Sequence, residues 1–400
     1  MRFLERGLGL KVGLIGVSAV AASYVGVGVA GADYSATPYD YVGVGGDTPQ
    51  FSFDFLANGD PDGDPGFNAL GPKDRLVTFD AESDANGRAS YYGSDGYLGA
   101  EAGQLEYPTD VLRGGENPTQ RVTSSGNSIT TLENDSSGDI NFVFSSTGLS
   151  GSAYAVPLHE YEFGTDTVSV VGSSTTVAPA SGLTDADLLG IYKTGTITNW
   201  SQVTDVSGYT GPNATIIPLL PPSTSAITST FEKAINGGST FTPDSNVVQV
   251  EQNDPTAIAL AAAPNDAIVP FSQARFNLLE GTSNTHGTLG TGSPYFPAIP
   301  GEPGFTSADQ GLAYPAQSQY APSLALIGSA ATTTVTDYVD IRQSDLSDTT
   351  KAEPGASVNW AQYLFAGASG VTPYIETAAA QALIKESGVT PVYVDKGSFT

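Results

Sequence analysis

Four short turns rich in serine, threonine and glycine are the parts of this chain best suited to bind a small ligand. Each lies at the end of a hydrophobic stretch or before an amphipathic one, where hydroxyl groups and the backbone N–H groups of a helix start become available. The candidate residues are Gly46, Asp47 and Thr48; Ser124, Ser125 and Gly126; Ser145 and Ser146; and Ser223, Thr224 and Ser225. Together they offer hydrogen-bond donors and one carboxylate, and no positive charge.

The same residue types also have a purely structural interpretation. Ser and Thr are common at turns and helix N-caps because their side chains bond to nearby backbone groups. Asp47 is the one charged residue of the set. It would favour a hydroxylated or cationic ligand if it faces one, and otherwise it is a local turn residue. The sequence leaves both interpretations open.

An acidic pattern in "NGDPDGDPG" (58–66) resembles the start of a calcium-binding loop, with Asp60, Asp62 and Asp64 at alternate positions. Pro65 stands where such a loop requires glycine, and Gly71 stands where it requires a bidentate glutamate. A solvated acidic loop is therefore favoured over a metal site.

No pattern in the sequence indicates catalysis or a cofactor. His159 and His286 are the only histidines, and they do not form a conventional zinc site by themselves. The chain has no G-x-S-x-G turn, no P-loop and no dinucleotide-binding fingerprint. We therefore expect a protein that is not an enzyme.

The N-terminus is typical of a secretory signal peptide. Arg2, Arg6 and Lys11 precede an apolar, small-residue run at 12–32 that ends in an A-x-A pattern, which would make Asp33 the first mature residue. The alternative is an uncleaved membrane anchor, since the run is nearly long enough to span a bilayer. Cleavage predicts a secreted or cell-surface protein without membrane insertion.

The formal net charge of −27 argues against binding to nucleic acid or to anionic membranes. It also repels an anionic solute at long range unless the site is locally positive. We interpret the charge as a device for solubility. The chain contains no cysteine, so neither a disulfide nor a lipidated cysteine holds the exported protein.

Strand patterns alternate with helix patterns along the chain, which predicts an α/β protein with mostly parallel sheets. The clearest helix signal lies in 181–203, where Thr184 is a cap, Asp185 and Asp187 fall in the first turn, and apolar residues follow. A helix is also expected to begin at Pro49, and 121–135 carries a helix-start signal before Ile129 and Leu132. Further helices are expected at 226–236, around 357–367 and at 372–387. Strands are expected at 74–82, 139–149, 166–174, 215–221, 265–272 and 332–342, and irregular segments at 84–119 and 280–322.

The segment "LTDADLLGIYKTGTITNW" (183–200) resembles a motif in the solute-binding proteins of phosphate ABC transporters. The turns at 45–48, 124–128 and 145–147 fall where that family has ligand loops, and 221–227 falls where it has an R-x-x-G-S-G-T loop. The resemblance implies a periplasmic-binding-protein type II fold with a ligand between two lobes. It places lobe 1 at 33–163 and 274–400, and lobe 2 at 164–273.

Two departures concern the family's phosphate site. The 221–227 loop lacks the expected arginine, with Pro221 or Pro222 near its place, and Ser146 follows Ser145 where the family has an aspartate. Loss of a charge-assisted contact removes about 1.5–3 kcal/mol. A cationic side chain from elsewhere, such as Arg121 or Arg275, would restore an oxyanion site.

Two hypotheses of different kinds follow from these patterns. The first is an exported solute-binding protein that takes up phosphate or a related oxyanion and delivers it to an ABC permease. The second is a secreted or surface protein used in adhesion or as an interaction scaffold, which keeps the fold and has lost phosphate binding.

Overall fold

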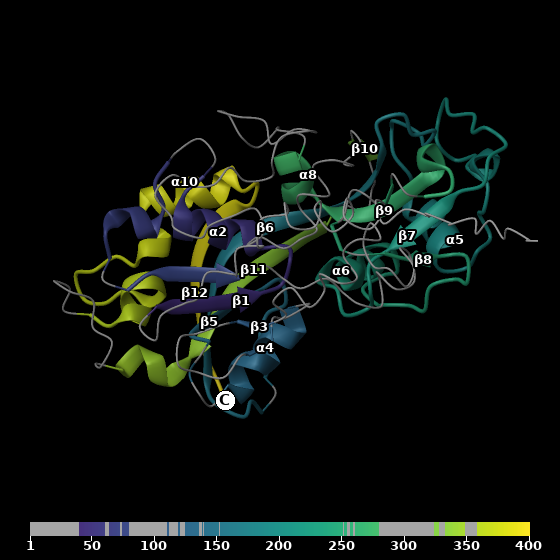
Figure 1. Cartoon of the computed structure of the whole chain (residues 1–400). Helices are drawn as coiled ribbons and strands as arrows, with labels where there is room; N and C mark the ends of the chain where they lie inside the picture. The colour runs from purple at the N-terminus through teal and green to yellow at the C-terminus, as the bar shows by residue number, and fades with distance from the viewer. Residues whose placement is uncertain are drawn as a thin grey trace, which may run out of the picture.

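Figure 1 shows the computed structural model of the chain, which is built around a large central sheet. The described residues are 40–60, 64–72, 74–79, 110–111, 119–120, 125–135, 138, 140–151, 153–250, 252–253, 257–258, 261–279, 324–327, 333–348 and 358–400. The expected signal peptide at 1–32 and nearly all of the segments 84–119 and 280–322 lie outside them. Within the described ranges, no helix is long and apolar enough to cross a membrane.

The main sheet has ten strands in the order β2-β1-β5-β11-β6-β9-β7-β8, with β10 and β12 also paired to β6. Its strands are β1 (Tyr41–Gly45), β2 (Leu76–Phe79), β5 (Phe142–Ser145), β6 (Leu158–Ser173), β7 (Ile217–Leu220), β8 (Val248–Gln249), β9 (Ala267–Ser272), β10 (Leu324–Ile327), β11 (Thr333–Arg342) and β12 (Thr390–Phe399). A separate ribbon consists of β3 (Asp110–Val111) and β4 (Thr119–Gln120).

The two ends of the sheet are parallel and its middle is antiparallel. β1 pairs in parallel with β2 and β5, and β7 with β8 and β9. Between them β6 and β11 pair antiparallel with each other, and β12 adds antiparallel to β6. The predicted α/β class is confirmed, while the prediction of mostly parallel sheets needs correction. The reason is that two long strands pass between the lobes and return against each other.

Helices cover both faces of this sheet. The α-helices are α2 (Gln50–Asn58), α4 (Ser125–Asn134), α5 (Asp185–Tyr192), α6 (Ala226–Ile235), α8 (Gln273–Leu279) and α10 (Ala378–Glu386). Shorter helical turns are η1 (Phe67–Leu70), η3 (Trp200–Gln202), η4 (Pro264–Asp266), η5 (Gln343–Ser347), the π-helical η6 (Gln362–Ala366) and η7 (Tyr374–Glu376). Two of the expected C-terminal elements are thus shorter than predicted, and β12 was not predicted.

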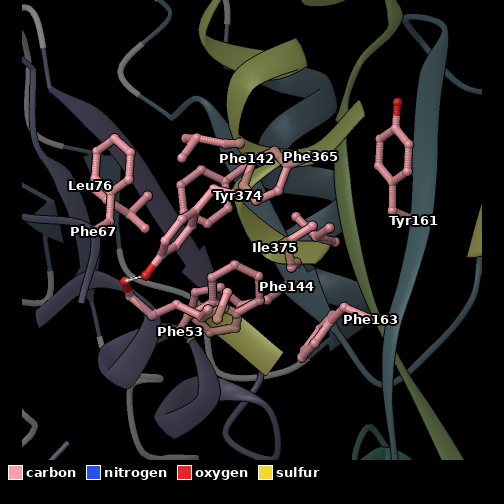
Figure 2. Packing of buried hydrophobic residues seen from close by; sticks show 14 of the residues in the cluster. Phe53, Phe67, Leu76, Phe142, Phe144, Tyr161, Phe163, Phe365, Tyr374 and Ile375 are labelled. Carbon is pink, nitrogen blue, oxygen red and sulfur yellow. Dashed lines mark hydrogen bonds between the residues drawn. The ribbon is translucent and has the colours of Figure 1, made fainter. Parts of the chain in front are cut away.

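The sheet of the first lobe buries side chains on both faces, because successive residues of a strand point to opposite sides. Phe142 and Phe144 of β5 pack with α2 and α10, whereas Val143 between them packs with α4. In the first of these layers Phe53 of α2 stacks on Phe144, with ring centroids 4.8 Å apart, and meets Phe163 edge-on at 5.1 Å. Figure 2 shows this aromatic layer.

The second lobe has its own core around α5 and α6, which pack on Val168, Val170 and Ile268. A further cluster joins the lobes, because Phe51 and Phe55 of α2 pack in it together with residues of β7, β9 and α8. In Figure 1, β6 and β11 run side by side from one lobe into the other. The two-lobed α/β architecture expected from the sequence is therefore present, and its residue boundaries remain a prediction.

The helix start predicted at Thr184 has a complete capping box. The Thr184 hydroxyl accepts the Asp187 N–H at 3.0 Å, and the Asp187 carboxylate accepts the Thr184 N–H at 3.0 Å. Asp187 is buried, and burial raises the pKa of its carboxyl group, an effect that the bonds from Thr184 oppose. Local sequence therefore fixes where α5 begins.

We expect Thr184→Ala to lower the free energy of unfolding by about 1 kcal/mol, because the variant leaves the Asp187 N–H without its cap. Urea unfolding followed by circular dichroism measures this change. Thr184→Ser keeps the hydroxyl and serves as the matched control, with stability close to that of the parent protein. Equal stability of the alanine and serine variants would contradict the capping role.

Candidate functional site

Three of the predicted turns meet in the first lobe, at the ends of β1 and β5 and at the start of α4. The Ser146 N–H donates to Ser125 Oγ at 2.9 Å. Gly46 lies against the same serine, since a Cβ at position 46 would stand 2.7 Å from Ser125 Oγ. Any larger residue at position 46 would collide with the start of α4. The loops after β1 and β5 and the start of α4 are therefore packed together.

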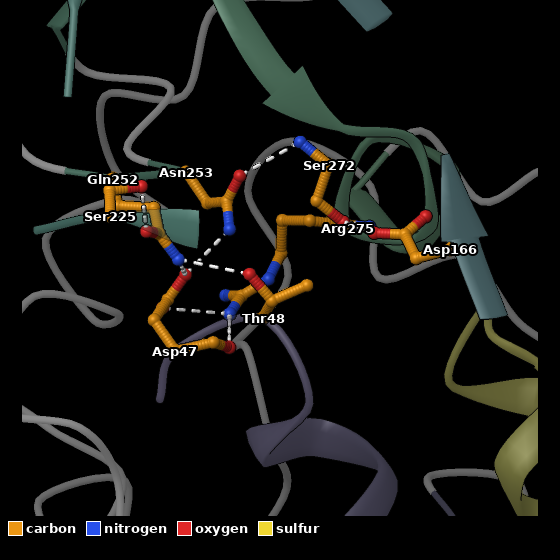
Figure 3. A network of polar contacts seen from close by, with 8 residues as sticks. All are labelled: Asp47, Thr48, Asp166, Ser225, Gln252, Asn253, Ser272 and Arg275. Carbon is orange, nitrogen blue, oxygen red and sulfur yellow. Dashed lines mark hydrogen bonds and ion pairs between the residues drawn. The ribbon is translucent and has the colours of Figure 1, made fainter. Parts of the chain in front are cut away.

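Asp47 forms the centre of a polar network that joins distant parts of the chain, shown in Figure 3. Its carboxylate accepts a hydrogen bond from Asn253 Nδ2 at 2.7 Å and forms an ion pair with Arg275 Nη2 at 3.0 Å. Arg275 Nη2 also donates to the Asp47 carbonyl at 3.2 Å. Asp47 is thus not merely a local turn residue.

Arg275 brings a buried positive charge to this network from α8. Its side chain is 1% exposed, and its guanidinium carbon lies 3.7 Å from the centroid of the Phe51 ring. Stacking on an aromatic face and pairing with a carboxylate both suit the planar guanidinium. The Ser272 hydroxyl accepts the Arg275 N–H at 3.0 Å and so fixes the start of α8.

Gln252 joins the loop after β1 to the start of α6. Its Nε2 donates to Thr48 Oγ1 at 2.9 Å, and its Oε1 accepts the Ser225 hydroxyl. Ser225 Oγ also accepts the Thr228 N–H and caps α6. Ser225 is therefore a helix cap and at the same time a link in the network.

Two buried aspartates lie behind these loops on the strands that run between the lobes. Asp166 of β6 accepts the Ser272 hydroxyl and the Ala274 N–H, the latter at 2.8 Å. Asp337 of β11 accepts the Ser146 hydroxyl at 2.5 Å. Burial raises the pKa of Asp166 to about 6, against its hydrogen bonds and the nearby Arg275 charge. Burial raises the pKa of Asp337 well above its ordinary value, and the charge of Asp166 adds to this rise.

The remaining predicted residues lie apart from the network. Ser145 is buried and bonds within its own turn to the backbone of Thr147. Gly126, Ser223 and Thr224 are exposed, and Ser124 lies outside the described residues. These positions remain predictions as ligand contacts.

The described residues of the acidic motif at 58–66 contact one another. Asp60 Oδ1 accepts the Asp64 N–H at 2.9 Å, and Gly59 forms a bridge with Pro65. Asp62 lies outside the described residues. In the part of the chain that the structure describes, no group of three or more His, Asp or Glu side chains could hold a metal ion.

His159 has structural partners. Its Nδ1 lies 2.8 Å from Gln343 Oε1, its Nε2 lies 2.7 Å from Asp395 Oδ1, and its ring stacks on Tyr161 at 4.7 Å. These contacts attach β12 to β6. His286 and Arg121 lie outside the described residues.

The sequence did not point to Gln252, Asn253, Ser272 or the two buried aspartates. It indicated Arg275 only as a residue that could restore an oxyanion site. A signal existed for Asn253, which precedes an Asp-Pro pair and has a positive φ of 52° typical of Asn in turns. For the aspartates there was none, because a polar residue that alternates with apolar ones in a strand ordinarily faces water.

The arrangement offers hydrogen-bond donors together with one guanidinium. The Thr48 and Ser125 hydroxyls each accept a hydrogen bond from described residues, and each keeps its own proton to donate. Hydroxyl donors beside an arginine match the acceptor oxygens of a small anion. The Asp47 carboxylate already neutralises this arginine, so an anion has to compete with it.

Comparison with known proteins finds one similar family. A family model described as a PBP superfamily domain matches residues 115–293. This stretch, a little under half of the chain, is therefore similar to the PBP superfamily domain, which agrees with the resemblance stated from the sequence. Among curated proteins none matches the chain.

Several solved structures are similar in outline. One is an ABC-type phosphate transport receptor from Vibrio cholerae, with 16% identity, 72% of this chain and 92% of that chain covered, and a TM-score of 0.40. Another is a putative phosphate ABC transporter substrate-binding protein with bound phosphate from Clostridium perfringens, with 13% identity, coverage of 88% and 99%, and a TM-score of 0.42. A third is a phosphate-binding protein from Stenotrophomonas maltophilia, with 13% identity, coverage of 76% and 79%, and a TM-score of 0.40.

Proposed function

We propose that this protein is an exported, non-enzymatic solute-binding protein that binds phosphate or a related oxyanion between its two lobes and delivers it to an ABC permease. The observation that carries the proposal is Arg275. The predicted turns alone supply no positive charge, and α8 brings a guanidinium to the loop after β1. The family resemblance of 183–200 and the signal-like N-terminus support uptake outside the cytoplasm.

The proposed ligand position lies beside Asp47, Thr48, Ser125 and Arg275, where the two hydroxyls donate and the guanidinium supplies the charge-assisted contact. The ligand has to draw Arg275 away from the Asp47 carboxylate or share it. Together with the net charge of −27, this predicts weaker binding than an uncompensated arginine would give.

Calorimetric titration of the mature protein with inorganic phosphate at physiological salt tests the proposal. We expect saturable heat and a rise in the melting temperature, because a ligand that binds only the folded state stabilises it. Sulfate in a parallel titration separates phosphate selectivity from general anion binding. If millimolar phosphate and sulfate give neither heat nor a melting shift, the uptake function is wrong and the surface-protein hypothesis replaces it.

A further inference from the structure

We infer that the buried residues Asp166 and Asp337 are positioning residues. Whether each carboxyl group carries a proton determines the hydrogen bonds of the loops beside the ligand position. Asp166, when ionised, holds the Ser272–Arg275 segment, and Asp337 holds Ser146 in its neutral form. The effect on phosphate rests on the proposed function, whereas the effect on the loops does not.

Strand register places the pair together at the passage between the lobes. Asp166 lies opposite Val335, and Asp337 lies opposite Gly164. Residues that face each other across an antiparallel pair point to the same side of the sheet, so the two aspartates are diagonal neighbours on one face. A β-bulge interrupts the register directly after Asp337. Both residues are at most 5% exposed.

One arm of hydrogen bonds leads from Asp337 to the first-lobe loops. Asp337 Oδ1 accepts the Ser146 hydroxyl, and the Ser146 N–H in turn donates to Ser125 Oγ, against which Gly46 packs. Asp337 Oδ2 is buried and has no hydrogen-bond partner among the described residues. A carboxylate with one accepted bond at such a site is strongly disfavoured, so the neutral acid is the stable form.

The other arm leads from Asp166 to the loops that surround Arg275. Asp166 accepts the Ser272 hydroxyl and the Ala274 N–H, and Ser272 Oγ accepts the Arg275 N–H. The Ser272 N–H donates to Asn253 Oδ1 at 2.9 Å, and Asn253 donates to Asp47. Ionised Asp166 therefore holds the backbone from which Arg275 reaches the ligand position.

The charges around the pair favour one negative charge, located on Asp166. Arg275 on α8 lowers the pKa of Asp166, whereas Asp166 raises that of Asp337. Asp166 also accepts three hydrogen bonds, including one from the Thr167 N–H at 2.6 Å. Other ionisable groups lie on the elements packed against the pair. On β11, Tyr338 follows Asp337 and has a raised pKa. On α6, Glu232 accepts the Phe241 N–H, and Lys233 is exposed.

A fall in pH should therefore weaken the hydrogen bonds that Asp166 accepts. With a pKa of about 6, Asp166 takes up a proton as the pH falls through that value. Asp337, which is buried and accepts a single hydrogen bond, is held in its neutral form by its surroundings. A protonated Asp166 is a poorer acceptor for the Ser272 hydroxyl and the backbone N–H groups. The segment that carries Arg275 then loosens, and the ligand position loses its arranged guanidinium.

The first experiment uses ligand-free protein, so that the ionisation of phosphate itself does not interfere. Hydrogen exchange of the 272–275 amides is measured from pH 5 to 7.5 and corrected for intrinsic rates. We expect protection to fall as the pH drops through about 6 in the parent protein, and to stay low at every pH in Asp166→Asn. Asp340→Asn is the matched control, because Asp340 is equally buried and its register partner is Glu160; it should keep the parent profile.

The second experiment compares phosphate affinity at pH 7. Asp166→Asn should weaken binding by about tenfold or more, because it removes a charged acceptor. Asp337→Asn resembles the neutral acid and should bind within about threefold of the parent protein. A flat exchange profile in the parent, or a pH-dependent one in Asp166→Asn, would overturn the inference, as would equal losses in both variants. If the parent binds no phosphate yet shows the exchange profile, the proposed function fails and the inference on the loops stands.

Discussion

Replacing Arg275 with methionine is expected to weaken phosphate binding by roughly 10- to 150-fold, which corresponds to about 1.5–3 kcal/mol. Methionine keeps the unbranched stem that packs on Phe51 and removes only the guanidinium. The lost contact is charge-assisted and buried, since the arginine side chain is 1% exposed. Calorimetric titration with phosphate measures the change directly.

Asp47→Asn is the variant that makes this result specific to charge. It preserves the shape of the residue and its oxygen for Arg275, and it removes the carboxylate that neutralises the guanidinium. We therefore expect phosphate to bind more tightly to Asp47→Asn than to the parent protein. If Arg275→Met keeps parental affinity while remaining folded, Arg275 serves the ion pair alone and the anion site is wrong.

Arg275 also shows where sequence reasoning stopped. The four turns were found because each carries a local signal: a strand followed by Gly, Ser or Thr and a helix start. The pairing of Arg275 with Asp47 spans 228 positions and has no local signal at all. The uncharged loop at 221–227 therefore carried no information about the Asp47–Arg275 pair, whose positive charge comes from the first turn of α8.

Helix starts were predicted closely for the same reason that long-range contacts were not. Ser225 caps α6 and Thr184 caps α5, both through bonds that span three residues. The strands in the middle of the sheet could not be predicted from such local signals. β6 is sixteen residues long and pairs with four other strands, so its polar residues are buried. From the alternation of polar and apolar residues alone, these polar residues were expected to face water.

Buried acids also predict an unusual pH dependence, with the folded state more stable at pH 4.5 than at pH 7.5. Burial raises the pKa of Asp166, Asp337, Asp340 and Glu160 above their ordinary values. The folded protein then binds more protons than the unfolded chain, so stability falls as the pH rises through the folded pKa. For Asp166 alone, the rise from 3.8 to about 6 is worth about 3 kcal/mol across that range.

Asp340→Asn isolates one of these groups. Asp340 is fully buried, and neither of its carboxyl oxygens has a hydrogen-bond partner within the described part of the chain. Its register partner across the sheet is Glu160, whose charge raises the pKa of Asp340 further. An amide carries no charge to desolvate, so we expect the variant to gain more than about 1 kcal/mol at pH 7.5 and much less at pH 4.5.

Urea unfolding of the parent protein and its variants at the two pH values measures both effects. General repulsion among the acidic residues also weakens the folded state as the pH rises, so the control has to remove one exposed charge. Glu376 is exposed on η7, and Glu376→Gln makes the same chemical change as Asp340→Asn at a solvated position. If the two variants gain equally, net charge explains the pH dependence. A gain confined to Asp340→Asn places its origin in the buried carboxyl groups of β6 and β11, the strands that connect the lobes.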